Sequence, residues 1–114
     1  TTFEAGFKNL PQGYDYNYIL HTKDFLNDVG YIKDTEKDIM VKIYTTQPAV
    51  QVYSGYYIPE VGGKFGKFSG VALETQHFPD AVNNPHFPSV ILNPGEKYRQ
   101  TTIWNVYSPI PQEE

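Results

Sequence analysis

The 114-residue sequence lacks cysteine, has a single arginine and contains no long run of apolar residues. Without cysteine the chain can form no disulfide, no thiolate metal site and no cysteine nucleophile. No apolar stretch approaches the ~20 residues of a membrane-spanning helix, so we expect no membrane partner. The net charge of −4 offers no basic surface, so we expect no nucleic-acid partner. The lack of cysteine and of an N-glycosylation sequon fits a cytoplasmic location, which we expect.

Aromatic residues, in contrast, are abundant: they make up 16% of the chain, with ten Tyr and seven Phe. A disordered chain would contain few aromatics, so this one is expected to fold. Nine Gly and nine Pro separate short runs rich in Tyr, Val, Ile, Phe and Thr. That composition is typical of strands joined by turns. No stretch shows the apolar spacing of an amphipathic helix, so we expect an all-β fold with almost no helix.

Alternation of apolar and polar residues locates the expected strands. It places Asp15 and Asn17 on one face of a strand, and Glu74 and Gln76 on one face of another. The expected strands cover residues 14–21, 39–46, 49–53, 69–76 and 98–107, the last being the longest. The other segments are expected to be a turn or short strand at 22–30, a strand start at 31–32, turns at 34–38 and 93–96, a surface loop at 62–67, a long irregular loop at 77–89 and an exposed tail at 108–114.

Two carboxylates are the main candidates for chemistry. Glu74 lies in an otherwise uncharged run and is either a side chain on the wet face of a strand or a carboxylate aimed into a cleft. A carboxylate in a cleft binds a proton more tightly and can act as a base near neutral pH. Asp15, between Tyr14 and Tyr16, is either an ordinary residue at a strand start or an acceptor for sugar hydroxyls. Carboxylates that accept from hydroxyl groups, beside aromatic rings that cover apolar faces, are a common way to bind sugars.

The remaining reactive side chains match no known site pattern. The histidines His21, His77 and His86 have no metal-ligand spacing, and H-E-x-x-H is absent, so we expect no metal. No serine lies in a G-x-S-x-G elbow, and the glycine-rich residues 62–67 lack the spacing of a phosphate-binding loop. The residues alone therefore indicate an aromatic-rich, all-β protein, and they leave sugar binding open as one of its functions.

Three ordered motifs carry a more specific signal. Residues 73–83 read L-E-T-Q-H-F-P-D-A-V-N and continue to P-G-E at 94–96 and T-T at 101–102. This stretch resembles the C-terminal part of the aldose 1-epimerase, or galactose mutarotase, family. Residues 13–18, G-Y-D-Y-N-Y, resemble the family's G-Y-D-H-N-[FY] motif. Residues 45–55 resemble its T-T-x-P-G-x-Q-x-Y-[ST]-[GA] motif.

The resemblance implies part of a β-supersandwich, the galactose mutarotase-like fold, with residues 1–114 forming the C-terminal strands of a single longer domain. The start at Thr1, without an initiator Met, is then expected for a processed chain or a piece of a longer one. The implied reaction interconverts the α and β anomers of an aldohexose such as galactose or glucose. It proceeds by acid–base ring opening and closure and requires no metal or cofactor.

The resemblance also assigns roles to three residues. Glu74 corresponds to the family's base, Asp15 to an acceptor for sugar hydroxyls and Gln51 to a polar sugar contact. Tyr16 stands where the family often has His, and Ala49 where Gly is common.

The family's acid is a histidine upstream of the G-Y-D motif, and residues 1–12 contain none. We therefore expect a second polypeptide carrying the N-terminal part of the same fold. The alternative is a non-catalytic sugar-binding or structural relative. An epimerase for phosphorylated hexoses is disfavoured, because Arg99 is the only arginine available for a phosphate clamp.

Overall fold

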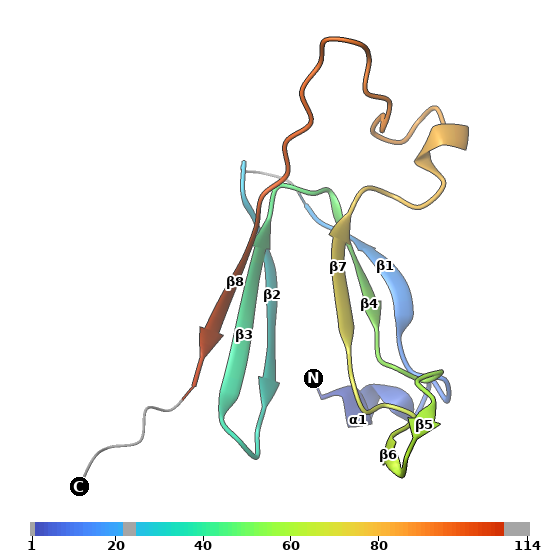
Figure 1. Ribbon diagram of the computed structural model, residues 1–114, viewed down its shortest axis with the longest axis vertical. Helices are drawn as coiled ribbons and strands as arrows, with labels where there is room; N and C mark the ends of the chain where they lie inside the picture. Colours follow the sequence, from blue (N-terminus) through green and yellow to red (C-terminus); the bar gives the residue numbers. More distant parts are fainter. Residues whose placement is uncertain (1, 22–24, 109–114) are drawn as a thin grey trace, which may run out of the picture.

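The computed structural model describes residues 2–21 and 25–108, and these form mostly antiparallel β-structure (Figure 1). One three-stranded sheet has the order β1-β4-β7, and a second has the order β2-β3-β8. The first comprises β1 (Asp15–Ile19), β4 (Ala49–Tyr53) and β7 (Ala72–Gln76); the second comprises β2 (Asn27–Asp34), β3 (Ile39–Thr45) and β8 (Thr102–Tyr107). The expected all-β class is confirmed. In the described part of the chain, no helix is long and apolar enough to cross a membrane.

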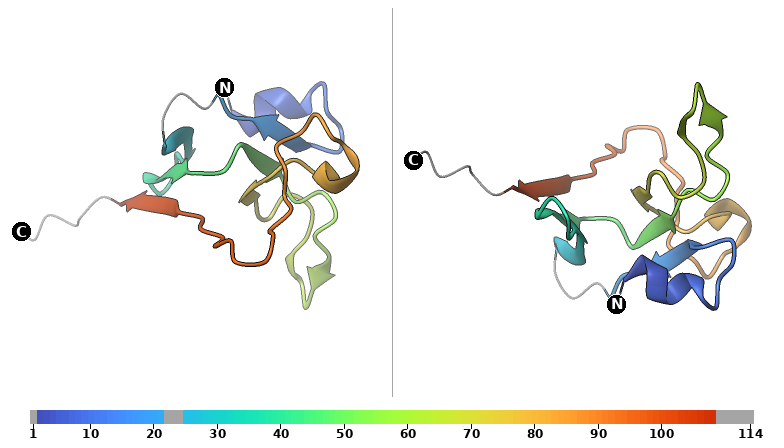
Figure 2. Two further views of the ribbon diagram at one scale, coloured as in Figure 1. Left: turned by 90° about the horizontal axis from the view of Figure 1, so that it is seen from above. Right: turned by 90° about the horizontal axis from the view of Figure 1, so that it is seen from below.

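The chain passes repeatedly between the two sheets. It leaves the first sheet after β1, builds β2 and β3, returns for β4 and β7, and ends in the second sheet with β8. Viewed along the strands, the sheets lie side by side (Figure 2). They meet at the end where β3 passes into β4. There Leu20 N–H donates to the Pro48 carbonyl at 2.8 Å, and Thr46 N–H donates to the Thr101 carbonyl at 3.0 Å.

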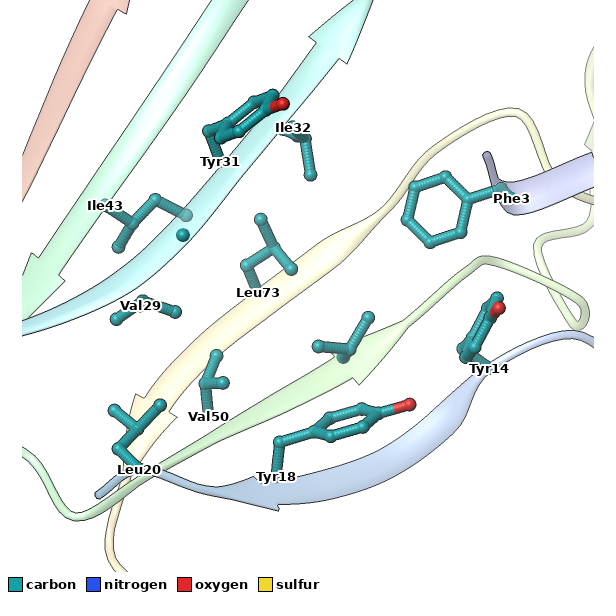
Figure 3. Close-up of a pocket in the computed structure, with 12 residues that line it drawn as sticks. Phe3, Tyr14, Tyr18, Leu20, Val29, Tyr31, Ile32, Ile43, Val50 and Leu73 are labelled. Carbon is teal, nitrogen blue, oxygen red and sulfur yellow. The ribbon is translucent and has the colours of Figure 1, made fainter. Parts of the chain in front are cut away.

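The core lies between the sheets. Strand alternation turns Val50 and Leu73 of the first sheet toward Val29 and Ile43 of the second, around a cavity of about 310 Å³ (Figure 3). Ile43 is 1% exposed and Val50 is 3% exposed. Burial of these side chains removes apolar surface from water, at about 25 cal/mol per Å². The opposite face of the first sheet is thereby left for polar side chains.

Helix α1 (Phe3–Phe7) precedes the first strand. Thr2 caps it, because its hydroxyl oxygen accepts from Ala5 N–H at 3.2 Å. The ring of Phe7 stacks on that of Phe68, with centroids 4.4 Å apart. A five-residue helix is too short to show helical periodicity, which is why the sequence pattern did not indicate it.

Strand β2 begins at Asn27, so the expected start at residues 31–32 was wrong. Asn27 is buried and its side-chain Nδ2 donates to the Gln47 carbonyl at 3.3 Å, which extends the strand toward the junction of the sheets. A register shift between Asp28 and Gly30 interrupts the alternation on which the expectation rested. Residues 22–24 of the expected turn or short strand lie outside the described residues.

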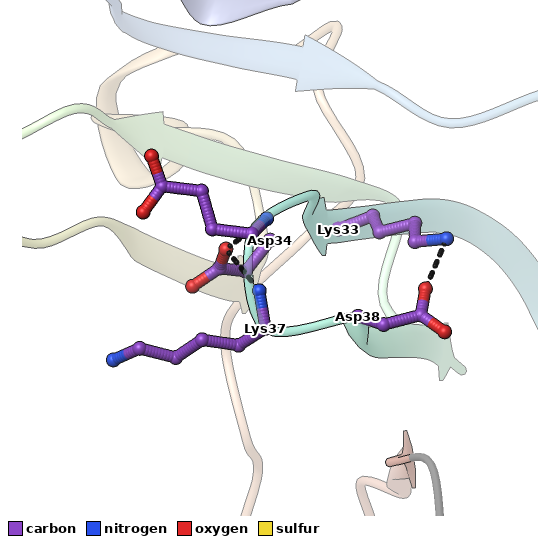
Figure 4. Close-up of polar contacts among 5 residues, drawn as sticks. Lys33, Asp34, Lys37 and Asp38 are labelled. Carbon is purple, nitrogen blue, oxygen red and sulfur yellow. Dashed lines mark hydrogen bonds and ion pairs between the residues drawn. The ribbon is translucent and has the colours of Figure 1, made fainter.

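The turn expected at residues 34–38 is confirmed. Asp34 Oδ1 accepts from the backbone N–H groups of Glu36 and Lys37, at 2.9 and 3.1 Å (Figure 4). An ion pair between Lys33 and Asp38 closes the hairpin beside it. The pKa of Lys33 is raised by this contact, because the hydrogen bond and the charge of Asp38 favour the protonated amine.

Two other expectations were wrong. Residues 62–67 are not a plain loop, because β5 (Glu60–Val61) and β6 (Lys64–Phe65) pair as a hairpin. Gly62 and Gly63 join them with φ values of 60° and 71°, and a two-residue type I′ turn requires positive φ at both positions. The last strand is shorter than expected, since β8 starts at Thr102, and the eight-residue β2 is the longest.

The segment between β7 and β8 agrees better with expectation. It is irregular apart from the single 3₁₀ turn η1 (Ala81–Asn83). The turn at residues 93–96 is confirmed by a hydrogen bond of 3.0 Å from Glu96 N–H to the Asn93 carbonyl. Residues 109–114 of the expected tail lie outside the described residues.

Candidate functional site

The three site residues indicated by the sequence lie on one face of the first sheet. In the register of its strands, Gln51 on β4 is directly opposite Glu74 on β7. On its other side, Gln51 is opposite Asn17 on β1. Directly opposed residues of antiparallel strands point to the same face, and so do residues two apart on one strand. Asp15, Gln51 and Glu74 therefore share the polar face that points away from the core.

Asp15 and Gln51 are joined directly. Gln51 Nε2 donates to Asp15 Oδ1 at 2.7 Å. The acceptor is an ionised carboxylate, and such charge-assisted bonds are shorter and stronger than those between neutral groups. Among the described residues this is the only side-chain hydrogen bond that Gln51 makes, so its second N–H and its carbonyl oxygen can still contact a ligand.

Glu74 is exposed at the edge of the first sheet, because β7 pairs only with β4 in the described part of the chain. Its carboxylate makes no hydrogen bond or ion pair with the residues described. The structure thus shows the first of the two expected positions, with Glu74 on the open face of a strand, where it projects from the same face as the other candidates. The geometry supplies an accessible carboxylate that a substrate or another polypeptide can cover.

Asn17 is a further polar residue on this face that the sequence motifs did not single out. It lies directly opposite Gln51, and its Nδ2 is buried with no hydrogen-bond partner among the described residues. A buried donor without an acceptor is costly. The signal was present in the sequence, since alternation already placed Asn17 on the same face as Asp15.

The entry into β1 is fixed by Ser54, the residue after β4. Its backbone N–H donates to the Tyr14 carbonyl at 2.8 Å, and its side-chain oxygen accepts from Tyr14 N–H at 2.8 Å. Gly13 precedes this pair with a φ of 72°, and a Cβ at that position would overlap the Ser54 hydroxyl. Glycine is therefore needed before Tyr14, and the G-Y-D sequence sets the position of Asp15 against β4.

The histidines are placed elsewhere. His77 lines a cavity of about 570 Å³ at the base of the loop between β7 and β8, together with Lys97 and Arg99. The ring of His86 lies against that of Phe87, with centroids 6.2 Å apart. Across residues 2–21 and 25–108, no group of three or more His, Asp or Glu side chains is arranged to hold a metal ion.

Comparison with known proteins identifies the family. The sequence model of the aldose 1-epimerase family matches residues 1–105. The chain belongs to the aldose 1-epimerase family. It is 39% identical to galactose mutarotase of Sus scrofa and 40% identical to that of Bos taurus, in each case over 101 residues. It is 34% identical to aldose 1-epimerase of Escherichia coli over 98 residues.

The chain spans less than a third of the length of these relatives. The match to the Sus scrofa protein covers 84% of this chain and 29% of the relative, and the match to the Escherichia coli protein covers 80% and 28%. The family assignment confirms the resemblance seen in the motifs. In this member of the aldose 1-epimerase family, the polar face of the first sheet gathers two carboxylates and two amides, which is a suitable set of partners for the hydroxyl groups of a sugar.

Proposed function

We propose that this chain contributes the base and part of the sugar-binding face of an aldose 1-epimerase. The substrate is an aldohexose such as galactose or glucose, and the reaction interconverts its α and β anomers. The observation that carries the proposal is the convergence of Asp15, Gln51 and Glu74 on one face of the first sheet, in a chain of this family.

The reaction needs one base and one acid. Glu74 takes the proton from the anomeric hydroxyl while an acid protonates the ring oxygen, so the bond from C1 to the ring oxygen breaks. Rotation about the C1–C2 bond exposes the other face of the aldehyde. The ring oxygen then attacks C1 and both protons return. No redox change occurs and no atom is gained or lost, so positioning and acid–base catalysis suffice.

The other side chains of the polar face orient the sugar. The carboxylate of Asp15 accepts hydrogen bonds from hydroxyl groups, and Gln51 both donates and accepts. A hexose held by these groups presents its anomeric carbon toward Glu74, which lies directly across from Gln51.

We further propose that a second polypeptide segment carries the rest of the fold and the acid. Trp104 and Val106 on β8 lie opposite Ile43 and Val41, so they belong to the face that packs inward. They remain 48% and 66% exposed. Exposed apolar residues on an edge strand are a surface for association. The complete assembly, meaning this chain with that segment, would supply the histidine opposite Glu74.

Gel filtration and hydrogen exchange on the chain by itself test this second proposal. We expect association or weak protection of the β8 amides, with protection rising when the complementary segment is added. A well-protected monomer that catalyses anomerisation unaided would contradict it.

A non-catalytic sugar-binding or structural relative is the second candidate. It is favoured by one observation, the exposed position of Glu74 without a facing acid in the described part of the chain. The two functions differ in a direct way: the catalytic assembly equilibrates the anomers of a freshly dissolved hexose, whereas a binding protein shifts the sugar's NMR signals without changing that rate.

The replacement Glu74→Gln in the complete assembly tests the role of the base. Polarimetry should show a rate lower by a factor of about 10²–10⁴, the usual contribution of a general base, while sugar binding is largely retained. Glu36→Gln is the matched control, because Glu36 lies in the exposed turn between β2 and β3. An unchanged rate in Glu74→Gln would remove Glu74 from the mechanism.

A further inference from the structure

A closed ring of hydrogen bonds joins the two sheets behind Glu74. It contains six residues, which come from the end of β3 and the β3–β4 connection, from β7, and from the start of β8 and the segment that leads into it (Figure 1). Its members are Thr45, Gln47, Thr75, Tyr98, Gln100 and Thr102. Four of these side chains end in hydroxyl groups, which both donate and accept and so can continue a chain of hydrogen bonds. Gln47 Oε1 is buried and has no partner among the described residues.

One half of the ring consists of threonine hydroxyls. Thr75 Oγ1 and Thr102 Oγ1 are 2.7 Å apart, and Thr102 Oγ1 and Thr45 Oγ1 are 3.2 Å apart. Thr45 Oγ1 accepts from Gln47 N–H at 3.2 Å and donates to the Thr101 carbonyl at 3.3 Å. The Thr45 hydroxyl donates its only hydrogen to the Thr101 carbonyl, so it must accept from Thr102. The Thr102 hydroxyl in turn accepts from Thr75.

The other half runs through the segment before β8. Gln100 Nε2 donates to the Thr75 carbonyl at 3.2 Å and approaches the Thr75 hydroxyl at 3.4 Å. Gln100 Oε1 accepts from the Tyr98 hydroxyl at 2.7 Å. Tyr98 in turn accepts from Gln47 Nε2 at 3.4 Å, which closes the ring. From Gln47 Nε2 to Thr45 the bonds all run in one direction, and hydrogen bonds in such chains strengthen one another. The bond from Gln47 N–H to Thr45 runs the other way, so Thr45 accepts from both ends of the chain.

The ring holds β7 at the residue next to Glu74. Successive residues of a strand point to opposite faces. The ring therefore bonds the Thr75 hydroxyl on the face of β7 opposite to the Glu74 carboxylate. In the described residues β7 has a neighbouring strand on one side only, so its backbone ladder leaves the strand free to twist or fray at that edge. Gln100 and Thr102 supply the missing restraint and tie β7 to the second sheet.

We propose that this ring positions Glu74 for proton transfer, with Gln100 and Thr102 as positioning residues that touch no substrate. The proposal rests on the proposed function of Glu74 as the base. Loss of the ring leaves sugar binding to Asp15 and Gln51 intact, because those residues are held by β1 and β4. It lowers the rate of the chemical step, since small displacements of a catalytic group reduce reaction rates steeply.

The test uses Thr102→Val, Thr102→Ser and Gln100→Leu in the complete assembly. Valine keeps the shape of threonine and removes the hydroxyl, whereas serine restores the hydroxyl. We expect Thr102→Val and Gln100→Leu to lower kcat by about tenfold or more with KM nearly unchanged, and Thr102→Ser to recover most of kcat. Gln100 is exposed, so its variant remains informative if Thr102→Val fails to fold. Thr35→Val, in the exposed turn, is the matched control.

A second readout does not depend on activity. The carboxyl ¹³C signal of Glu74, identified by its disappearance in Glu74→Gln, should shift or broaden in Thr102→Val and Gln100→Leu but not in Thr35→Val. An unchanged signal together with an unchanged kcat overturns the proposal, as does a Thr102→Ser variant as slow as Thr102→Val. If Glu74→Gln keeps the parental rate, the proposed function fails, and the NMR signal alone then decides whether the ring positions Glu74.

Discussion

Gln51 reaches diagonally across the first sheet to bond Asp15, although the residue directly opposite Gln51 is Asn17. The diagonal bond spans two strands and orients the amide of Gln51 relative to the carboxylate of Asp15. On the other neighbouring strand, β7, the residue directly opposite Gln51 is Glu74. The central strand β4 therefore places Gln51 between the proposed sugar-binding carboxylate and the proposed base.

Replacement of Asp15 by Ala should weaken sugar binding. It removes a charged acceptor for hydroxyl groups and the partner of Gln51. Hydrogen bonds to charged groups contribute about 1.5–3 kcal/mol, which corresponds to a Kd raised about 10- to 150-fold. Titration calorimetry of the complete assembly with galactose measures this. Asp28→Ala, on the second sheet, is the control, and equal Kd values for the two variants would argue against a sugar contact at Asp15.

Replacement of Ser54 by Ala should destabilise the fold. Ser54 is 4% exposed, and its hydroxyl is the acceptor for Tyr14 N–H at the start of β1. A buried N–H left without an acceptor costs about 1–3 kcal/mol. Urea unfolding should show that loss in the free energy of unfolding, whereas Ser69→Ala at an exposed position should show almost none. Equal midpoints for both variants would mean that Tyr14 finds another partner.

Replacement of Gly13 by Ala should cost more stability than replacement of Gly62. Both residues have positive φ, at 72° and 60°, where an L side chain is strained by about 1–2 kcal/mol. A Cβ at Gly13 also overlaps the Ser54 hydroxyl, whereas a Cβ at Gly62 meets nothing within 4 Å. Thermal unfolding gives the stability loss of each variant, and the difference between the two losses is the cost of the overlap with Ser54. Similar losses at both positions would show that the Ser54 contact relaxes without cost.

Alkaline pH should destabilise the fold through Tyr18. Burial raises the pKa of Tyr18, and the neighbouring Tyr14 and Tyr16 raise it further. A group with a raised folded-state pKa contributes stability below its unfolded pKa of about 10, and that contribution is lost as the pH rises through the folded value. The free energy of unfolding should therefore fall above about pH 10, and Tyr18→Phe should reduce the fall. Urea titrations of both proteins across that pH range give the comparison.

The sequence was sufficient to place the candidate residues on faces but not to pair the strands. Alternation put Asp15 with Asn17, and Glu74 with Gln76, and the structure agrees. Which strand lies beside which depends on contacts between distant residues. The order β1-β4-β7 makes Gln51 the centre of the row, and nothing in the local pattern indicates that order.

The strand ends that differ from the prediction also depend on contacts between residues far apart in the sequence. The early start of β2 depends on a buried bond from Asn27 to the Gln47 carbonyl, twenty residues away. The start of β8 at Thr102 leaves Tyr98 and Gln100 outside the strand, where they complete the hydrogen-bond ring instead. The hairpin at Gly62 and Gly63 is different, because paired glycines are a recognisable signal for a type I′ turn.

The alternation of the chain between two sheets also bears on folding. The first sheet is complete only when residue 76 has joined β4, and the second waits for residues 102–107, although its first strand begins at residue 27. Neither sheet is encoded by a contiguous segment, so most pairings close long loops and folding is expected to be slow. The two sheets should then form and unfold in a single cooperative transition, because the strands of each sheet are interleaved along the chain with those of the other.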